Sequence, residues 1–219
     1  MTYISLTIWD VAAVSVFVLM NGLLSLWLSL GIERQLLLAS VRMVVQLSAV
    51  GAVLTLLFSV ATLPWTLAMA AVMVLFAGRE ISARQKRPLA GWWGYGLGTA
   101  TMTMAAATLT LVALLGAIQP EPWYHPRYAI PLLGMILGNT MTGISLGLDT
   151  LTTAAVRERG PIEARIALGA ARFEALRPAM QEAMRRGLMP MINAMAAAGV
   201  VSLPGMMTGQ ILAGVPPGE

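Results

Sequence analysis

Two adjacent methionines beside a Pro-Gly break are the side chains in this sequence best suited to binding a metal. Met206 and Met207 follow Pro204 and Gly205, and thioethers are soft ligands that suit Cu(I) better than iron. In transporters, a membrane helix interrupted in this way often exposes its backbone to the cargo. The alternative is core packing, because the chain contains sixteen methionines. We therefore treat Met206 and Met207 as weak candidate ligands, and Pro204 and Gly205 as candidate residues of a translocation path.

Residues 143–147 match the Gly-x-Ser-x-Gly pattern of serine hydrolases, with Ser145 at the centre. That elbow requires a strand, a turn and a helix, with a histidine base nearby. Here the pattern lies in an expected helix, and His125, the only histidine, lies in a loop expected on the opposite side of the membrane. His125 has Glu121 four residues away but no further ligand, so it makes no dedicated metal site. The sequence predicts no catalytic residue.

Two absences restrict the chemistry further. The chain has no cysteine, which excludes disulfides and thiolate metal sites. It also has no Gly-x-x-x-x-Gly-Lys-Ser/Thr motif, so it cannot hold ATP phosphates in a P-loop. We expect no cofactor in this chain and no enzymatic activity of its own.

Composition and charge distribution indicate an all-α, polytopic helical membrane protein. The 219 residues are 58% hydrophobic and 11% charged, against about 25% charged in an average soluble domain. A spanning helix needs about 20 predominantly apolar residues. Each uncharged run is long enough for at least one span, and these runs are residues 11–32, 43–78, 88–120, 128–148 and 187–218.

We predict six spans followed by a short broken C-terminal segment, within one permease domain covering residues 1–219. The first apolar stretch is too long for a signal peptide and lacks a basic region before it, so we expect it to be retained as a span. Thr62 and Pro64 should break the chain before the third span, which is expected to be short, and a basic loop should follow at residues 79–87. The expected spans are residues 8–30, 37–57, 65–77, 92–118, 128–148 and 188–203.

The distribution of Lys and Arg predicts the orientation. With the N-terminus outside, thirteen of the fourteen basic residues fall on the cytoplasmic side and only Arg127 is outside. Positive residues concentrate in cytoplasmic loops. This distribution favours a multi-pass protein of the cytoplasmic (inner) membrane over a nucleic-acid-binding protein, although the isoelectric point is about 10.1.

Polar side chains within the expected spans are candidates for lining a path through the membrane. Arg42 and Gln46 lie one helical turn apart on the second span, and Asn139, Thr142 and Ser145 give the fifth span a polar side. Intramembrane charges usually face protein or water, but Arg42 could instead extend to the headgroups. In the fifth span, glycines at positions 134, 138, 143 and 147 make close helix packing the alternative explanation.

Residues 149–190 form a polar segment that holds seven of the fourteen Lys and Arg and five of the ten Asp and Glu. We expect two cytoplasmic helices, the first opened by Gly160-Pro161 with Glu163 in its first turn. In the second, Phe173, Leu176, Met180 and Met184 form an apolar stripe, and Pro178 should bend or divide the helix. Such a helix could lie on the bilayer surface, or it could dock into a groove of a soluble partner.

Residues 163–169, Glu-Ala-Arg-Ile-Ala-Leu-Gly, resemble the Glu-Ala-Ala-x-x-x-Gly loop of ABC-transporter permeases, which forms the coupling helix that inserts into the ATPase subunit. Arg165 replaces the second alanine, and Pro190 lies further downstream than the usual apolar-Pro ending. The resemblance implies coupling contacts by Glu163, Ala164 and Gly169, and we add Phe173 from the helix that follows.

Residues 134–141 and 200–209 look like signature stretches of the Fet-type iron-export permeases, a family that includes plant aluminium-tolerance half-transporters; residues 33–51 are similar as well. The resemblance implies the membrane subunit of an ABC exporter of iron, or one that handles metal stress. It implies a homodimer with a separate ATPase that binds ATP and Mg, in contact with membrane lipid and not with nucleic acid. It also implies a final span beyond residues 213–214, which this sequence does not contain.

Two other functions remain open. An ATP-independent carrier driven by an ion gradient should contain acidic residues within its spans, whereas Asp10 and Asp149 lie at span ends. A membrane scaffold or regulator that transports nothing would need no polar path. Neither the cargo nor the direction of transport can be derived from the residues alone.

Overall fold

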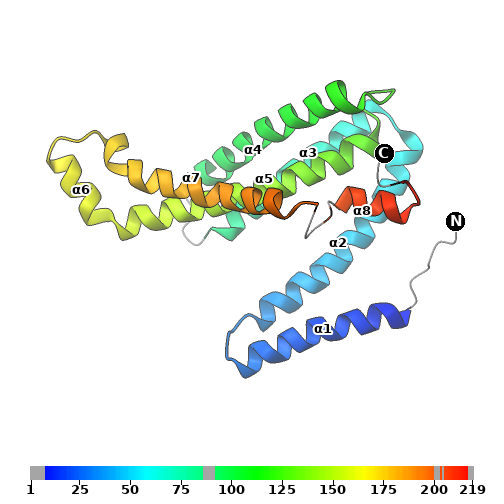
Figure 1. The fold of residues 1–219 in the computed structure, drawn as a ribbon, viewed down its shortest axis with the longest axis horizontal. Coiled ribbons are helices and arrows are strands. Elements are labelled where there is room, and N and C mark those ends of the chain that lie inside the picture. Colours follow the sequence, from blue (N-terminus) through cyan, green and yellow to red (C-terminus); the bar gives the residue numbers. More distant parts are fainter. Residues whose placement is uncertain (1–7, 86–91, 200–202, 204, 217–219) are drawn as a thin grey trace. The chain divides into compact units, whose positions relative to one another are not determined.

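The computed structural model describes residues 8–85, 92–199, 203 and 205–216 of the chain. This part is helical and contains no β-strand, which confirms the all-α prediction (Figure 1). Its contacts separate into two units, residues 1–59 with 211–219 and residues 60–210. The elements are α1 Ile8–Trp27, α2 Glu33–Val60, α3 Leu63–Arg84, α4 Trp92–Val112, the π-helix η1 Ala113–Ile118, α5 Pro126–Arg157, α6 Arg159–Ala167, α7 Arg172–Ala197 and α8 Gly205–Leu212.

Within the described residues, four helical segments are long and apolar enough to cross a membrane, namely Glu33–Val60, Leu63–Arg84, Gly94–Ile118 and Pro126–Arg157. They correspond to the second to fifth expected spans. Residues Ser15–Trp27 of α1 form a shorter apolar helix, and the expected sixth span falls on the second half of α7, which ends at Ala197. The count of six spans therefore stays a prediction.

In the first unit, α1 and α2 form a helical hairpin fastened by a buried serine. The Ser25 hydroxyl donates to Oε2 of Glu33 at 2.9 Å and accepts from the Ile32 amide at 3.4 Å. Gly31 takes a positive φ of 69° in the turn. Glu33, which lies between the expected first and second spans, is the first residue of α2, where an acidic side chain is favourable to the helix dipole.

Helix α3 begins where the sequence predicts but continues further. Thr62 is its N-cap in extended conformation, and Pro64 lies in the first turn, where a missing N–H costs little. The helix does not end near residue 77: it extends through Arg79 and Glu80 to Arg84. The prediction of a short third span with a loop starting at residue 79 was therefore wrong. Charged residues end an apolar run but do not end a helix.

The core of the second unit lies among α3, α4 and α5. Ile81 of α3 and Met102 of α4 are fully buried, together with Ala106, Leu133 and Leu137. Thr99 lies directly against Gly78, and Gly134 of α5 approaches the methyl group of Met73. Small residues at these points allow the three backbones to approach closely, as in other membrane helix bundles.

The loop before α5 is ordered by local caps. The π-helix η1 ends at Gln119, a left-handed residue (φ 48°) whose amide donates to the Leu114 carbonyl at 2.8 Å. The His125 side chain accepts from the Arg127 amide through Nδ1 at 3.3 Å, which makes His125 the N-cap of α5. This agrees with its interpretation as a loop residue.

Candidate functional site: the α6–α7 hairpin

Helix α5 carries the membrane span directly into the polar segment. The helix runs without interruption from Pro126 through Asp149 to Arg157, and a single residue, Glu158, separates it from α6 (Figure 1). The first nine residues of the segment expected at 149–190 therefore belong to α5. A displacement of α6 would be transmitted along α5 because no flexible linker intervenes.

Helix α6 begins two residues earlier than Pro161. Pro161 occupies its third position, where the backbone amide needs no partner within the helix. Glu163 is consequently the fifth helical residue and not part of the first turn, so the expected contact with the helix dipole was wrong. Its carboxylate instead pairs with Arg159 at 2.7 Å, one turn away. The hydrogen bond to Glu163 raises the pKa of Arg159, and this exposed pair contributes little to stability.

Gly169 ends α6 in a Schellman motif. Its φ is +97°, a region that other residues enter only with strain. The Gly169 amide donates to the Ile166 carbonyl at 2.9 Å, and the Ala170 amide donates to the Arg165 carbonyl at 3.0 Å. The glycine of the Glu-Ala-Ala-x-x-x-Gly pattern is thus required here by backbone conformation, since no neighbour lies within 4 Å of a Cβ placed on it.

Helix α7 returns alongside α5 and is tied to α6 by Arg165. The guanidinium of Arg165 donates to the Ala175 carbonyl at 3.4 Å. At the start of α7, Oε2 of Glu174 accepts from the Ala171 amide at 3.3 Å. Pro178 removes one helical hydrogen bond but does not divide the helix, which is continuous to Ala197. We call residues 159–187 the α6–α7 hairpin.

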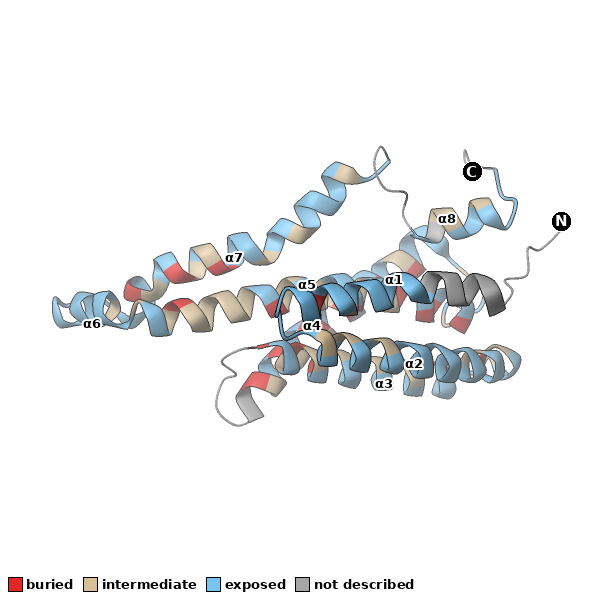
Figure 2. Cartoon of the chain, turned by 90° about the horizontal axis from the view of Figure 1, so that it is seen from below, coloured by how far each residue is buried: buried red, intermediate tan, exposed pale blue. Residues whose placement is uncertain are grey.

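The buried face of α7 is not the one that the apolar stripe predicts. Its buried residues are Ala175, Ala179 and Ala183, spaced one turn apart, whereas Phe173 and Met184 are exposed (Figure 2). The physical reason is the close approach of α5, which only small side chains permit. Leu176 and Met180, in the middle of the stripe, are half-buried.

The hairpin presents two large apolar side chains at its tip. Leu168 is 88% exposed and Phe173 is 66% exposed, on either side of Gly169. Phe173 was among the predicted contact residues, whereas Leu168 was not. The signal that could have identified Leu168 is its position, since it is an apolar residue directly before the glycine that caps a helix expected in water. Of the other predicted contacts, Ala164 and Glu163 are on exposed parts of α6.

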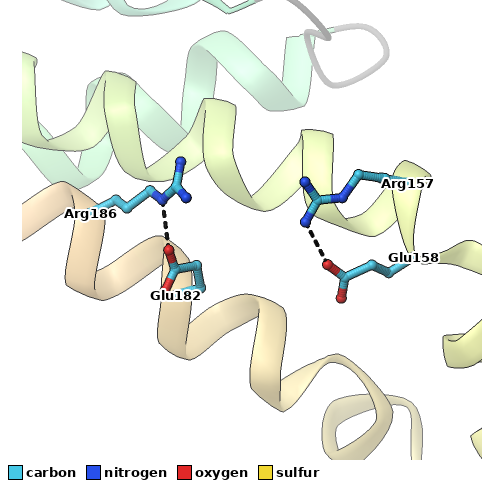
Figure 3. A network of polar contacts seen from close by, with 4 residues as sticks. All are labelled: Arg157, Glu158, Glu182 and Arg186. Atoms are coloured by element: carbon cyan, nitrogen blue, oxygen red, sulfur yellow. Dashed lines mark hydrogen bonds and ion pairs between the residues drawn. The ribbon is translucent and has the colours of Figure 1, made fainter.

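Charged side chains cover the base of the hairpin. Arg157 pairs with Glu158 at 2.8 Å, and Arg186 pairs with Glu182 at 2.7 Å (Figure 3). The hydrogen bond from Arg186 lowers the pKa of Glu182. Because the pKa of Glu182 is lower in the folded state, the pair stabilises the fold at pH values above the pKa that Glu182 has in the unfolded chain. This contribution disappears as pH falls through the lowered pKa of the folded state. Both pairs are local, since each joins residues one or four positions apart in the chain.

Toward the membrane, α5 and α7 are in backbone contact. A Cβ on Gly143 would lie 2.9 Å from the Gly187 carbonyl oxygen, and one on Gly147 would lie 3.4 Å from that of Ala183. An apolar groove of about 480 Å³ runs along this crossing. Met180, Met184 and Asn139 are among its lining residues.

The structure brings only one of the predicted path residues of α5 to this groove. Asn139 lines it, whereas the Thr142 hydroxyl donates to the Gly138 carbonyl of its own helix at 3.0 Å. Ser145 is buried away from the groove, and its hydroxyl has no hydrogen-bond partner. Its place in the interior of α5 excludes the hydrolase elbow, which needs a strand and a turn.

The remaining candidates lie on other elements of the chain. Arg42 and Gln46 lie on α2 in the first unit, and Gly205 is the exposed first residue of α8. Met207 is half-buried, while Pro204 and the Met206 side chain lie outside the described residues. Within the described ranges, no group of three or more His, Cys, Asp or Glu residues could hold a metal ion.

Several apolar helices of spanning length, joined to a long polar hairpin, define a polytopic helical membrane protein. The chain belongs to the UPF0014 family of membrane proteins, since the family described as "Uncharacterised protein family (UPF0014)" matches residues 8–219. This finding confirms the family resemblance of the sequence, because relatives of the chain include a protein named as a probable iron export permease and a plant protein named for aluminium sensitivity.

Three relatives illustrate the similarity. The UPF0014 membrane protein slr1647 of Synechocystis is 37% identical over 87% of this chain and 73% of its own length. The protein ALUMINUM SENSITIVE 3 of Arabidopsis thaliana is 30% identical over 95% of this chain and 74% of its own length. The probable iron export permease protein FetB of Escherichia coli is 30% identical over 86% of this chain and 70% of its own length. No solved structure matches the chain.

Proposed function

We propose that this chain is the membrane-spanning permease subunit of an ABC exporter, and that its α6–α7 hairpin docks on a separate ATPase subunit. The observation that carries the proposal is the tip of the hairpin. Leu168 and Phe173 are both mostly exposed there, on either side of the Gly169 cap, in a hairpin that follows α5 after a single residue. A helical tip with two apolar anchors suits insertion into a hydrophobic groove.

Burial of the two anchors would supply much of the docking energy. Fully burying a Leu or Phe side chain contributes about 1.5–3 kcal/mol relative to exposure in water. The Gly169 cap holds both anchors in one geometry before binding, which lowers the entropic cost of association. Glu163 and Ala164, on the exposed surface of α6, would complete the contact.

The ATPase supplies the energy, because this sequence lacks a P-loop motif of its own. ATP and Mg bind to that partner, and we propose two copies of each subunit. Closure of the two ATPases moves the hairpin tip. Since α5 passes from span to hairpin without a linker, and α7 returns in backbone contact at Gly143 and Gly187, the displacement reaches the crossing of these helices and changes access to the path.

We propose iron, or another cargo related to metal stress, as the substrate, on the basis of the Escherichia coli relative named as a probable iron export permease. Asn139 in the α5–α7 groove is the path residue that geometry favours. The chain would lie in the inner membrane with its N-terminus outside and the hairpin in the cytoplasm, as the concentration of basic residues there favours.

Copurification with a coexpressed ABC ATPase tests the docking. Leu168→Asp and Phe173→Asp should each weaken recovery of the ATPase roughly tenfold or more, because each places a charge in an apolar contact. Val156→Asp is the matched control, since Val156 is exposed on the cytoplasmic part of α5 and away from the tip. If all three variants recover the ATPase equally, the hairpin does not dock by this tip.

The cargo is tested separately, in cells that express the complete transporter under iron load. The proposal requires lower cytoplasmic iron with the wild-type transporter than without it, and Leu168→Asp should abolish this difference. Equal iron contents with and without the wild-type transporter would reject the cargo while leaving the docking result intact. Iron that stays low in the docking-deficient variant would favour the ATP-independent carrier.

A further inference from the structure

A second cavity lies at the end of the α3–α4–α5 bundle opposite to the α6–α7 hairpin. It has a volume of about 590 Å³, within the range of ligand sites. Its walls come from the start of α3, the end of α4 with η1, and the start of α5, and they are almost wholly apolar. Examples of the lining residues are Leu67 of α3, Leu111 of α4 and Ile130 of α5.

One hydroxyl in this wall has no partner. The Thr110 side chain is 8% exposed, and its Oγ1 atom makes no hydrogen bond. The two other threonines of the wall differ: Thr66 donates to the Thr62 carbonyl at 3.0 Å, and Thr103 donates to the Thr99 carbonyl at 2.6 Å. A buried hydroxyl is normally paired. The Oγ1 atom itself has almost no accessible surface, so a rotation of the Thr110 side chain would present this donor to whatever fills the cavity.

The helix changes its form next to Thr110. Three residues later α4 becomes the π-helix η1, and Leu114 of η1 belongs to the cavity wall. Single π-turns are uncommon and occur often at functional sites. The widened turn is thus a second feature, independent of the hydroxyl, that distinguishes this end of the bundle.

An aromatic pair stands at the mouth. Trp123 and Tyr124, in the loop between η1 and α5, line the cavity and pack edge to face with ring centroids 5.8 Å apart. Trp and Tyr are typical of the membrane interface, where one side of the ring is apolar and the other is wet. The mouth is accordingly at headgroup level, and the leucine-rich walls extend from it into the hydrocarbon.

We propose that this cavity binds a membrane phospholipid, with one acyl chain along the apolar walls. The Thr110 hydroxyl donates to an ester carbonyl of the lipid, and Trp123 and Tyr124 contact the headgroup region. An ester carbonyl is a free acceptor on a slender chain, and the side of the cavity is open to lipid at the exposed Leu67.

Photocrosslinking of the full chain in phospholipid nanodiscs tests this proposal. A phospholipid with a diazirine on one acyl chain should label peptides from residues 63–75, 103–114 and 123–133. Ala107→Trp fills the cavity and should reduce this labelling about fivefold or more, whereas Leu109→Trp, on the outer side of the same helix, should not. Thr110→Val should reduce labelling roughly two- to tenfold through the lost hydrogen bond, and the exposed Thr108→Val should leave it unchanged.

Two results would overturn the assignment. Labelling that is uniform along α4 and insensitive to Ala107→Trp would show only bulk lipid contact. Residue-to-residue crosslinks joining residues 33–60 to the cavity wall would show that the protein itself fills the space. Melting temperatures of all four variants separate lost binding from lost folding, and Ala107→Leu provides a milder filling variant. The readout needs neither an ATPase nor a cargo, so it is independent of the proposed function.

Discussion

The carbonyl oxygen of Gly187 lies 2.9 Å from the position that a Cβ atom would occupy on Gly143, and the reverse contact has the same distance. Neither residue can carry a side chain without moving a backbone. The two helices that join the membrane part to the α6–α7 hairpin thus meet at a pair of glycines. Further along the crossing, Gly147 lies over Ala183.

Alanine at either glycine should separate α5 from α7. We expect Gly143→Ala and Gly187→Ala each to destabilise the protein by about 1–3 kcal/mol, as overpacking in a tight interface does. Gly138→Ala is the matched control, because Gly138 lies on the same helix with open space around it. Thermal unfolding in detergent measures the difference. The crossing is not tight if Gly143→Ala and Gly138→Ala have the same midpoint.

A second tight contact, between Gly78 and Thr99, permits a rescue experiment. A methyl group on Gly78 would collide with the Thr99 hydroxyl, which lies on α4 in the bundle core. Gly78→Ala should therefore lower the unfolding midpoint, and adding Thr99→Ala should recover part of the loss. Gly96→Ala, on the same α4 helix in open space, should be nearly neutral. An unchanged midpoint in Gly78→Ala would contradict this geometry.

The sequence predicted the helical class and most helix starts because these depend on local signals. The apolar runs, the break at Thr62 and Pro64, and the start of α4 at Trp92 can all be read directly from the residues. The end of α3 was missed because polarity marks the edge of a membrane and not the end of a helix. The N-cap of α6 was missed because Pro161 is compatible with several positions of a first turn.

The candidate site was also predicted only in part, because sequence patterns report local features and not the distance between two helices. Hydrophobic periodicity identifies large residues, so it selected Phe173 and Met184 and not the alanine face at Ala175 and Ala179. Which face is buried depends on how closely α5 approaches, and that distance follows from Gly143 and Gly187, forty-four residues apart. Leu168 gave no periodic signal because it stands at the end of α6, where the helix stops.

The capping role of Gly169 in α6 can be tested by substitutions that alter no side-chain contact. Gly169→Ala should destabilise the hairpin by about 1–2 kcal/mol, since an L-residue is strained at a φ of +97°. Gly169→Asn should cost less, because asparagine tolerates this region. Gly160→Ala, inside α6 and in open space, should cost less than Gly169→Ala, although an alanine before Pro161 is mildly strained in a helix. Hydrogen exchange of residues 159–187 measures local opening. Equal protection in Gly169→Ala and Gly160→Ala would exclude a capping role.

The orientation of the chain can be tested by single-cysteine labelling, since the natural sequence has no cysteine and gives no background. Only α5 separates the η1–α5 loop from the α6–α7 hairpin along the chain, so the two must lie on opposite sides if α5 spans the membrane. Glu121→Cys, at an exposed position of the loop, should react with an impermeant maleimide in intact spheroplasts. Leu168→Cys should react only after permeabilisation, because the basic hairpin is retained in the cytoplasm. Labelling of Leu168→Cys in intact spheroplasts would reverse the topology and place the hairpin beyond the reach of any cytoplasmic ATPase.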